Sequence, residues 1–249
     1  MRRLQPGWGL VPILLFLLGW EIVGRFHVNH QNILPPFSTT LQEFWILLDN
    51  GVLGTNFLAS FLRVGAGLIA GSIAGISLGI IMGWNRLVNR SLNPILSLFY
   101  PIPALGWLPL FMLWIGISEL LPIAIVFMCS FFPILYNTIT GVKGVDKGYV
   151  RAAQTLGASN LQILVTVVVP LALPNIFTGL KLEAGMCWRT IIAAEMIAIP
   201  TGLGALLMKA QSLIRVDIII VVLVVLAVMS LSFERIFAML EWRFTRRWR

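Results

Sequence analysis

Hydrophobic residues gather in six stretches of the chain, and polar residues separate them. The stretches cover about residues 7–26, 61–84, 95–117, 120–139, 174–199 and 218–240. A helix rises 1.5 Å per residue, so stretches of about 20 residues cross a hydrocarbon core of about 30 Å. We therefore predict an all-α integral membrane protein of about six transmembrane helices, folded as a single domain over residues 1–249.

The ends of the first stretch decide whether it stays in the mature protein. Its basic start and apolar run resemble a signal peptide, but no small-x-small cleavage site follows, and the chain continues into Trp20 and Glu21. We interpret it as a retained first span. The polar segment 27–60 is then an external loop, with one short helix predicted around residues 40–49.

The composition supports a membrane protein. Hydrophobic residues make up 58% of the chain and charged residues only 11%, whereas a soluble domain carries about 25% charged residues. The lipid bilayer is therefore the expected surrounding of most of the chain.

The basic residues fall unevenly on the two sides of a six-span chain. Of the 18 Lys and Arg, Lys181 and Arg189 lie inside a span and four lie on one side: Arg25, Arg63, Lys209 and Arg215. Twelve lie on the other side: Arg2, Arg3, Arg86, Arg90, Lys143, Lys147, Arg151, Arg235, Arg243, Arg246, Arg247 and Arg249. The positive-inside rule places the richer side, and both termini, in the cytoplasm. The basic tail is expected to meet anionic lipid headgroups, so no nucleic-acid partner is predicted.

The second stretch carries glycines four residues apart, at Gly67, Gly71, Gly75 and Gly79, with Gly83 following. Successive members drift only about 40° around a helix, so they form one smooth strip. Such a strip lets another helix approach closely. Tight packing within the bundle and a surface that slides during transport both fit this pattern.

Prolines interrupt the third stretch at Pro101, Pro103 and Pro109. Proline removes a backbone donor, and irregular backbone at membrane depth is tolerated only inside protein or beside a water-filled cavity. The prolines therefore indicate either a broken helix near a translocation pathway, with Pro103 and Pro109 as candidate residues, or a structural kink.

The fifth stretch holds Lys181, Glu183, Arg189 and Glu195. A charge at the bilayer centre costs about 2.5–3.5 kcal/mol on insertion scales, so this span should lie in the bundle interior. Lys181 and Glu195 share a stripe with Trp188 but lie about 21 Å apart along the helix, too far to pair with each other. Either Lys181 and Glu195 lie near the interfaces or pair with neighbouring helices, or Arg189 or Lys181 attracts an anion in transit and Glu195 helps to gate.

The segment 151–170, RAAQTLGASNLQILVTVVVP, leaves the membrane between the fourth and fifth spans. Ala152 and Ala153 favour helix and present almost no side chain. Gly157 permits a sharp turn between two short helices. Pro170 and Pro174 are expected to end the second helix and to start the fifth span. The sequence predicts a cytoplasmic helical hairpin with a flat surface, suited to docking on a second protein.

This segment resembles the EAA loop of binding-protein-dependent ABC transporter permeases. Ala152 and Ala153, then Gly157 four residues after Ala153 and Pro170 thirteen beyond it, match the family spacing, while Arg151 stands where the family has Glu. PIPALGWLPLFMLWIG at 101–116, GMCWRTIIAAEM at 185–196 and GLG at 202–204 are similar to the nitrate, sulfonate, taurine and bicarbonate subgroup. The resemblance covers about residues 60–240.

The resemblance implies the permease subunit of an ATP-driven importer with a type I fold, carrying a small, anionic solute across the bacterial inner membrane. It implies a second copy of the permease, separate cytoplasmic ATPase subunits and an extracytoplasmic solute-binding protein. The chain itself contains no G-x-x-x-x-G-K-[ST] phosphate cradle. ATP and Mg²⁺ are therefore expected on the partner ATPase, with no cofactor on this chain and no enzymatic activity of its own.

Two other classes of function remain open from the residues alone. A stand-alone secondary transporter driven by an ion gradient favours an internal duplication and carboxylates near the midplane, and only Glu195 is a good candidate. A membrane enzyme needs a cluster of His, Cys or carboxylate side chains, but the histidines, His27 and His30, lie in the external loop. Cys129 and Cys187 lack metal-ligand spacing and are interpreted as packing residues, so no metal site is predicted.

Overall fold

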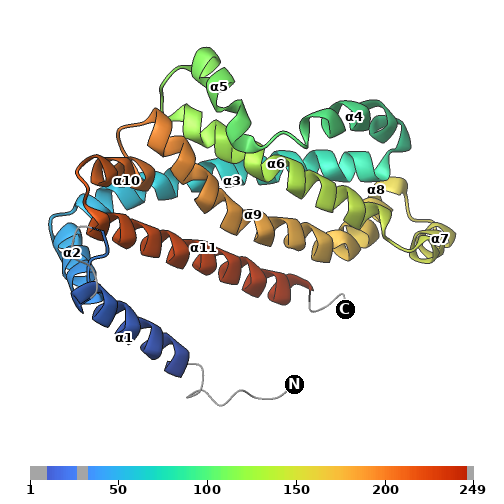
Figure 1. Ribbon diagram of the computed structural model, residues 1–249. Coiled ribbons are helices and arrows are strands. Elements are labelled where there is room, and N and C mark those ends of the chain that lie inside the picture. Colours follow the sequence, from blue (N-terminus) through green and yellow to red (C-terminus); the bar gives the residue numbers. More distant parts are fainter. Residues whose placement is uncertain (1–9, 27–32, 246–249) are drawn as a thin grey trace.

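A computed structural model describes residues 10–26 and 33–245, and the regular secondary structure of this part of the chain is all helical (Figure 1). Arg2, Arg3, His27, His30, Arg246, Arg247 and Arg249, which the sequence arguments used, lie outside the described residues. The α-helices are α1 (Leu10–Phe26), α2 (Phe37–Asp49), α3 (Val52–Trp84), α4 (Arg86–Phe99), α5 (Leu108–Ile115), α6 (Leu120–Lys143), α7 (Lys147–Thr155), α8 (Asn160–Ile163), α9 (Val169–Ala198), α10 (Leu203–Ser212) and α11 (Val216–Thr245). A 3₁₀ turn, η1 (Ala104–Trp107), precedes α5, and a π-helical stretch, η2 (Leu164–Val168), joins α8 to α9.

Four helical segments of the described chain are long and apolar enough to cross a membrane: α3, α6, the continuous run Asn160–Ala198, and α11. The fold class is therefore the expected all-helical membrane protein. The predicted short external helix is present as α2. The described part of the first stretch, α1, has 17 residues and packs on α2, so its crossing of the membrane stays a prediction.

The third stretch is a broken helix, which is one of the two alternatives that its prolines indicated, but it begins earlier than the predicted residue 95. Helices α4 and η1–α5 meet at an angle of 83°, so residues 86–115 form a broken span or a re-entrant loop. The break falls at Tyr100–Pro103, because Pro101 and Pro103 cannot supply helical backbone donors. Pro109 does not break a helix: it lies in the first turn of α5, where no donor is needed.

The fifth span also differs from its predicted limits. The chain is helical without interruption from Asn160 to Ala198, and Pro170 and Pro174 lie inside this run. The expectation that they would end one helix and start another is wrong. The π-helical stretch η2 ends two residues before Pro170, and such a widened turn accommodates a residue that cannot complete the normal bonding pattern. The second limb of the hairpin is therefore the beginning of α9's own helical run.

The glycine strip packs α3 directly against α6. Gly67, Gly71, Gly75 and Gly79 are all buried, and a Cβ on any of them would meet atoms of α6. At Gly79 the added carbon would lie 2.6 Å from Thr138 Cβ and 3.0 Å from the carbonyl oxygen of Leu135. The structure thus confirms the packing interpretation, whereas sliding along the strip stays a prediction.

We expect Gly79→Ala to destabilise the protein by about 1–3 kcal/mol, because its methyl group overpacks a backbone-to-helix contact. Gly65→Ala is the matched control on the same helix, since a Cβ there meets nothing within 4 Å. Thermal unfolding of the two detergent-purified variants compares them. Equal melting temperatures would contradict the assigned contact.

The two ends of the bundle carry different elements (Figure 1). Helices α2 and α10 lie at one end, and the start of α4 lies at the other end together with α7 and α8. Lys143 Nζ donates to Asn89 Oδ1 at 2.9 Å and ties the end of α6 to α4. Basic side chains assigned to the richer side, such as Arg86, Lys147 and Arg151, thus lie at the hairpin end, and Lys209 lies at the opposite end in α10.

Candidate functional site

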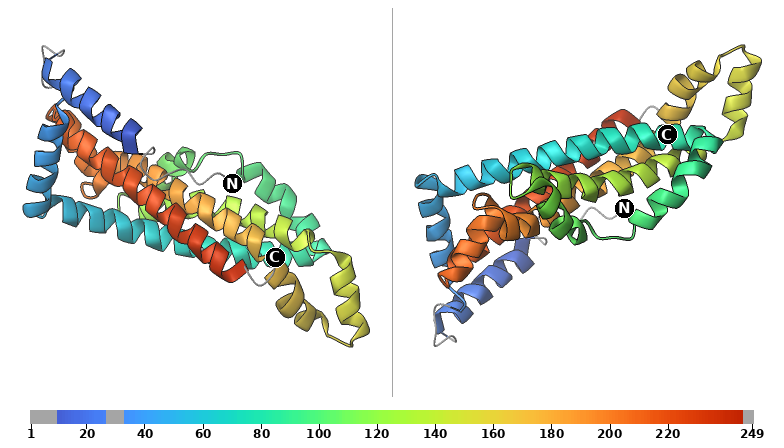
Figure 2. Two further views of the ribbon diagram at one scale, coloured as in Figure 1. Left: turned by 90° about the horizontal axis from the view of Figure 1, so that it is seen from below. Right: turned by 90° about the horizontal axis from the view of Figure 1, so that it is seen from above.

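A helical hairpin extends beyond the end of the bundle, and α7 and α8 form its two limbs (Figure 2). Asp146 caps α7 by accepting a hydrogen bond from the Gly148 amide at 2.7 Å. Gly157 turns the chain with φ +82°, a conformation that other residues resist. Ser159 and Gln162 then form a reciprocal capping box that starts α8. The sequence predicted this turn correctly because each of these signals is local.

The two alanines of the hairpin face different surroundings. Ala153 is half-buried and packs with a cluster that includes Val142, Ile163 and Val168. Ala152 is exposed, as is Arg151. The structure therefore makes Ala152 a surface residue of the hairpin and Ala153 a contact that holds the hairpin to the bundle.

The outer surface of the hairpin carries large apolar side chains besides the alanines on which the expectation of a flat surface rested. Leu156 is 87% exposed at the tip, and Tyr149 and Leu161 are also exposed. Tyr149, Ala152 and Leu156 recur at spacings of three and four residues, so they line one side of α7. Large apolar side chains grouped outside a bundle mark a surface for another protein. In the sequence, a leucine next to the turn glycine Gly157 was the signal that could have predicted this exposed apolar surface.

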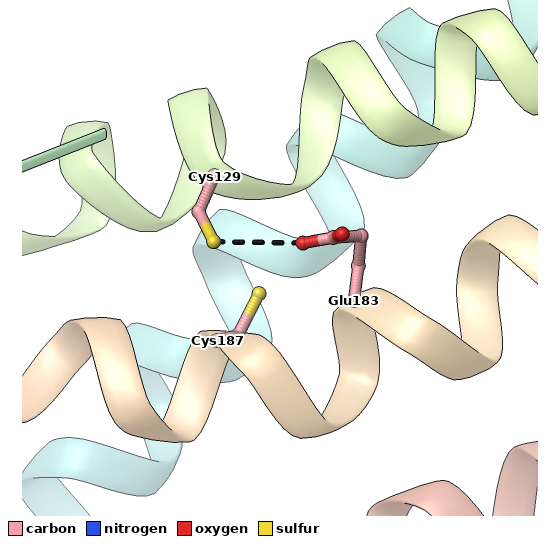
Figure 3. A group of neighbouring side chains, drawn as sticks. All are labelled: Cys129, Glu183 and Cys187. Carbon is pink, nitrogen blue, oxygen red and sulfur yellow. Dashed lines mark hydrogen bonds between the residues drawn. The ribbon is translucent and has the colours of Figure 1, made fainter. Parts of the chain in front are cut away.

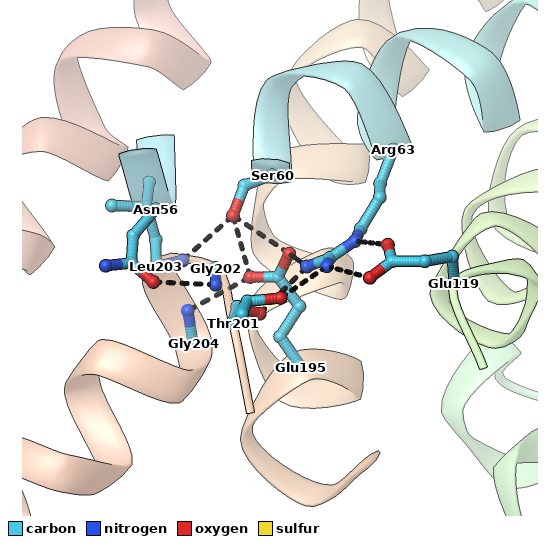
Figure 4. A network of polar contacts seen from close by, with 9 residues as sticks. All are labelled: Asn56, Ser60, Arg63, Glu119, Glu195, Thr201, Gly202, Leu203 and Gly204. Atoms are coloured by element: carbon cyan, nitrogen blue, oxygen red, sulfur yellow. Dashed lines mark hydrogen bonds and ion pairs between the residues drawn. The ribbon is translucent and has the colours of Figure 1, made fainter. Parts of the chain in front are cut away.

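A second group of polar side chains is buried at the α10 end of the bundle (Figure 4). Glu195 of α9 is fully buried. Its carboxylate accepts hydrogen bonds from Ser60 Oγ at 2.7 Å, from Arg63 Nη1 at 2.7 Å and from the Gly204 amide at 3.0 Å. The charge of Glu195 is therefore neutralised and hydrogen-bonded within the protein, as a buried ion requires.

Arg63 connects this carboxylate to a further helix. Its Nε and Nη2 donate to the two oxygens of Glu119 at 2.6 and 2.8 Å, and its Nη1 donates to the Thr201 carbonyl at 2.8 Å. The hydrogen bonds from the Arg63 guanidinium lower the pKa of Glu119, which lies outside the spans. One guanidinium thus links α3, the start of α6, the end of α9 and the loop before α10.

The lysine of the fifth span also pairs with a neighbouring helix. Lys181 Nζ lies 3.5 Å from Glu241 Oε2 of α11. The explanation that Lys181 and Glu195 pair with neighbouring helices is therefore confirmed. The proposed gating role of Glu195 stays a prediction. Sequence reasoning missed Arg63 as its partner because the two residues are 132 positions apart.

Trp188 belongs to an aromatic core and not to an open pathway in this conformation. It is fully buried between α3 and α11, with ring centroids 6.2 Å from Phe57 and 5.4 Å from Phe233. Within the described residues its indole Nε1 has no hydrogen-bond partner. The same residue forms part of the wall of a cavity between α9 and α11.

Arg189, the residue that follows Trp188, is exposed on the surface of α9. Its Nη1 lies 3.8 Å from the sulfur of Met186. It also lines a cavity of ≈ 540 Å³ between α9 and α11. Pro103 lines a separate cavity of ≈ 300 Å³ with Met186, and Pro109 is exposed on α5. Of the candidate pathway residues, Trp188 and Arg189 line one cavity, and the others lie elsewhere. The structure therefore does not bring all of them into one site.

The structure brings together Cys129, Glu183 and Cys187, which the sequence did not connect (Figure 3). Their ligand atoms all lie within 4.8 Å of one another. The interpretation of the cysteines as isolated packing residues is incomplete, because the sequence spacing says nothing about the crossing of α6 over α9.

The fold defines the class: a multi-span, all-helical membrane protein with exposed apolar side chains on a hairpin outside the bundle. Residues 67–246 match the family described as "Binding-protein-dependent transport system inner membrane component". The chain belongs to this family, whose members are the membrane-spanning permeases of ABC importers and not stand-alone transporters or enzymes. The family name implies a binding protein and an ATPase as partners and a location in the inner membrane; its permeases typically bind no cofactor.

Individual relatives align along nearly the whole chain. An ABC transporter permease protein of Methanocaldococcus jannaschii is 39% identical over 90% of this chain and 85% of its own length. The taurine transport system permease of Escherichia coli is 34% identical over 94% of this chain and 86% of its own length. The nitrate import permease of Synechocystis is 31% identical over 93% of this chain and 86% of its own length.

A solved structure shares the fold. A chain of the inward-facing methionine ABC transporter MetNI superposes with a TM-score of 0.60 at 15% sequence identity, covering 80% of this chain and 97% of that one. At that identity the likeness supports the fold alone.

Proposed function

We propose that this chain imports a small anion of the taurine, sulfonate or nitrate type, as one of two permease copies driven by a separate ATPase. The choice of this class of anions rests on the alignment of taurine and nitrate permeases over more than 90% of the chain. In this proposal residues 1–249 form one transmembrane domain, and a solute-binding protein delivers the anion from the outside.

The hairpin is the proposed contact for the ATPase. It projects from the bundle (Figure 2) and exposes Tyr149, Ala152 and Leu156 on one side. Arg151, Gly157 and Pro170 complete the segment that resembles the EAA loop. Burying the exposed apolar side chains against a second protein contributes favourable free energy, and the unbroken helix from Asn160 to Ala198 transmits movement of the hairpin into the membrane.

The hairpin end is the proposed cytoplasmic end. Basic residues of the richer side gather there, at Arg86, Arg90, Lys143, Lys147 and Arg151, and an excess of Lys and Arg marks cytoplasmic segments. By the same argument both chain termini lie in the cytoplasm. The network around Arg63 and Glu195 is then near the outer face.

The exposed side of α9 is the proposed wall of the anion pathway. Leu182, Met186, Arg189 and Ile197 are exposed at helical spacing. Leaving an arginine in lipid costs about 2.5–3.5 kcal/mol, so this stripe needs water or a second protein surface beside it. A second permease copy facing the stripe satisfies both needs and places two Arg189 side chains along one pathway.

We expect Arg189→Gln to reduce anion uptake about tenfold, which corresponds to about 1.4 kcal/mol of lost attraction for the anion. Uptake of labelled taurine, an aliphatic sulfonate and nitrate by the complete transporter first identifies the imported solute. Arg189→Lys is the matched control, because it retains the positive charge. Unchanged uptake in Arg189→Gln would exclude Arg189 from the pathway.

A further inference from the structure

We propose that Cys129, Glu183 and Cys187 form a binding site for a thiophilic divalent cation such as Zn²⁺, held inside the membrane between α6 and α9. Glu183 and Cys187 are four residues apart on α9 and so share one face of that helix. Cys129 faces them from α6 (Figure 3). Each residue offers one ligand atom, and these atoms lie within 4.8 Å of one another.

The separations match a tetrahedral cation. Bonds of about 2.0–2.3 Å to sulfur and oxygen place neighbouring ligand atoms about 3.5–3.8 Å apart. Cys129 Sγ already lies 3.5 Å from Glu183 Oε2, so the α6 and α9 donors are spaced for a shared ion. Thr190 Oγ1, 3.2 Å from Cys129 Sγ, is a further oxygen at the rim of the group.

The buried carboxylate needs a partner that the described residues do not provide. Glu183 is 7% exposed, and within the described chain it accepts a hydrogen bond from the weak thiol donor of Cys129. The ion pairs found among the described residues involve other carboxylates, as that of Lys181 involves Glu241. A buried charge without a counter-charge is costly, and a divalent cation supplies that counter-charge.

The donor set selects the kind of metal. Two thiolates and one carboxylate favour Zn²⁺ and Cd²⁺ over Mg²⁺ and Ca²⁺, which prefer oxygen ligands throughout. Cys129 and Glu183 also line the cavity of ≈ 300 Å³ that extends to Pro103 and Met186. That cavity leaves room for entry of the ion and for a water molecule as its fourth ligand.

Cadmium binding to the full-length permease in detergent tests the site, using protein purified without a metal-binding tag. Cd²⁺ titration is expected to give an ultraviolet thiolate-to-cadmium charge-transfer band that saturates at one ion per chain and disappears when Zn²⁺ is added. The affinity should fall at least tenfold in Cys129→Ser, in Cys187→Ser and in Glu183→Gln. Met186→Leu is the matched control on the cavity wall and should bind as wild type.

Two results would overturn the proposal: no charge-transfer band in the wild type, or equal affinity in wild type and Glu183→Gln, which would reduce the site to the thiols alone. Thiol labelling in native membranes provides a second measurement for variants that do not purify. Zn²⁺ should slow maleimide labelling of Cys129 in the wild type at least tenfold, and should not do so in Glu183→Gln. Unprotected labelling in the wild type would also overturn the site.

Discussion

An Ala152→Asp variant is expected to lose solute uptake almost completely while its membrane bundle stays folded. Ala152 is exposed on α7, on the same side as Tyr149 and Leu156. If that side meets the ATPase, the new carboxylate is buried there without a partner, at a cost of about 3–5 kcal/mol. A loss of that size lowers the affinity between the two proteins by more than about a hundredfold.

Three measurements on the Ala152→Asp variant separate docking from folding: uptake, co-purification of the ATPase, and thermal unfolding of the permease. Gln154→Asp is the matched control, because Gln154 is exposed on the same helix but lies about 180° from the midpoint of the Tyr149–Leu156 side. Wild-type uptake in Ala152→Asp, or equal losses in both variants, would contradict the assigned docking side.

Ala153→Asp should behave differently from Ala152→Asp. Ala153 packs with Val142, Ile163 and Val168, so a carboxylate there also detaches the hairpin from the bundle. Its expected result is a lower melting temperature together with lost uptake. The difference between the two adjacent alanines is therefore itself informative about which side of α7 faces outward.

The second large effect is expected at the buried ion pair. Arg63→Met should destabilise the protein by about 3–5 kcal/mol, because it leaves Glu195 buried without a counter-charge. Adding Glu195→Gln to this variant should recover part of the loss, since the unpaired charge is then removed. Unfolding of the single and double variants in detergent provides the measurement.

An exposed ion pair provides the control for Arg63→Met. Arg215 Nη2 lies 2.9 Å from Glu43 Oε2, but the Arg215 side chain is 44% exposed. Arg215→Met should therefore change the stability by no more than about 1 kcal/mol. Equal destabilisation in Arg63→Met and Arg215→Met would show that burial of the Arg63 network is not what stabilises the α10 end.

Much of the fold followed from local sequence signals. The apolar stretches located α3, α6, α9 and α11, because lipid requires long runs of hydrophobic side chains. The glycine spacing of four identified the face of α3 that packs on α6. The turn at Gly157 was recognisable because a positive φ favours glycine.

Other features could not be read from local signals. Three prolines predicted a break or a kink in the third stretch, but they did not predict the 83° angle between α4 and η1–α5. The prolines at 170 and 174 predicted a helix boundary that does not exist. The helix continues past them, and a π-helical stretch with a widened turn precedes them. A proline in the sequence shows which backbone N–H donor is missing. How the chain accommodates the missing hydrogen bond depends on the helices that pack around it.

The sequence by itself determined that this protein lies in a membrane, which face of α3 packs on α6, and which family the hairpin segment resembles. These properties depend on hydrophobic runs and on residues separated by a few positions. Only the tertiary structure decided that Arg63 neutralises Glu195, that Ala152 faces outward while Ala153 faces inward, and that Cys129 meets Glu183 and Cys187. Those pairings join residues of different helices, and their contacts depend on how the helices cross.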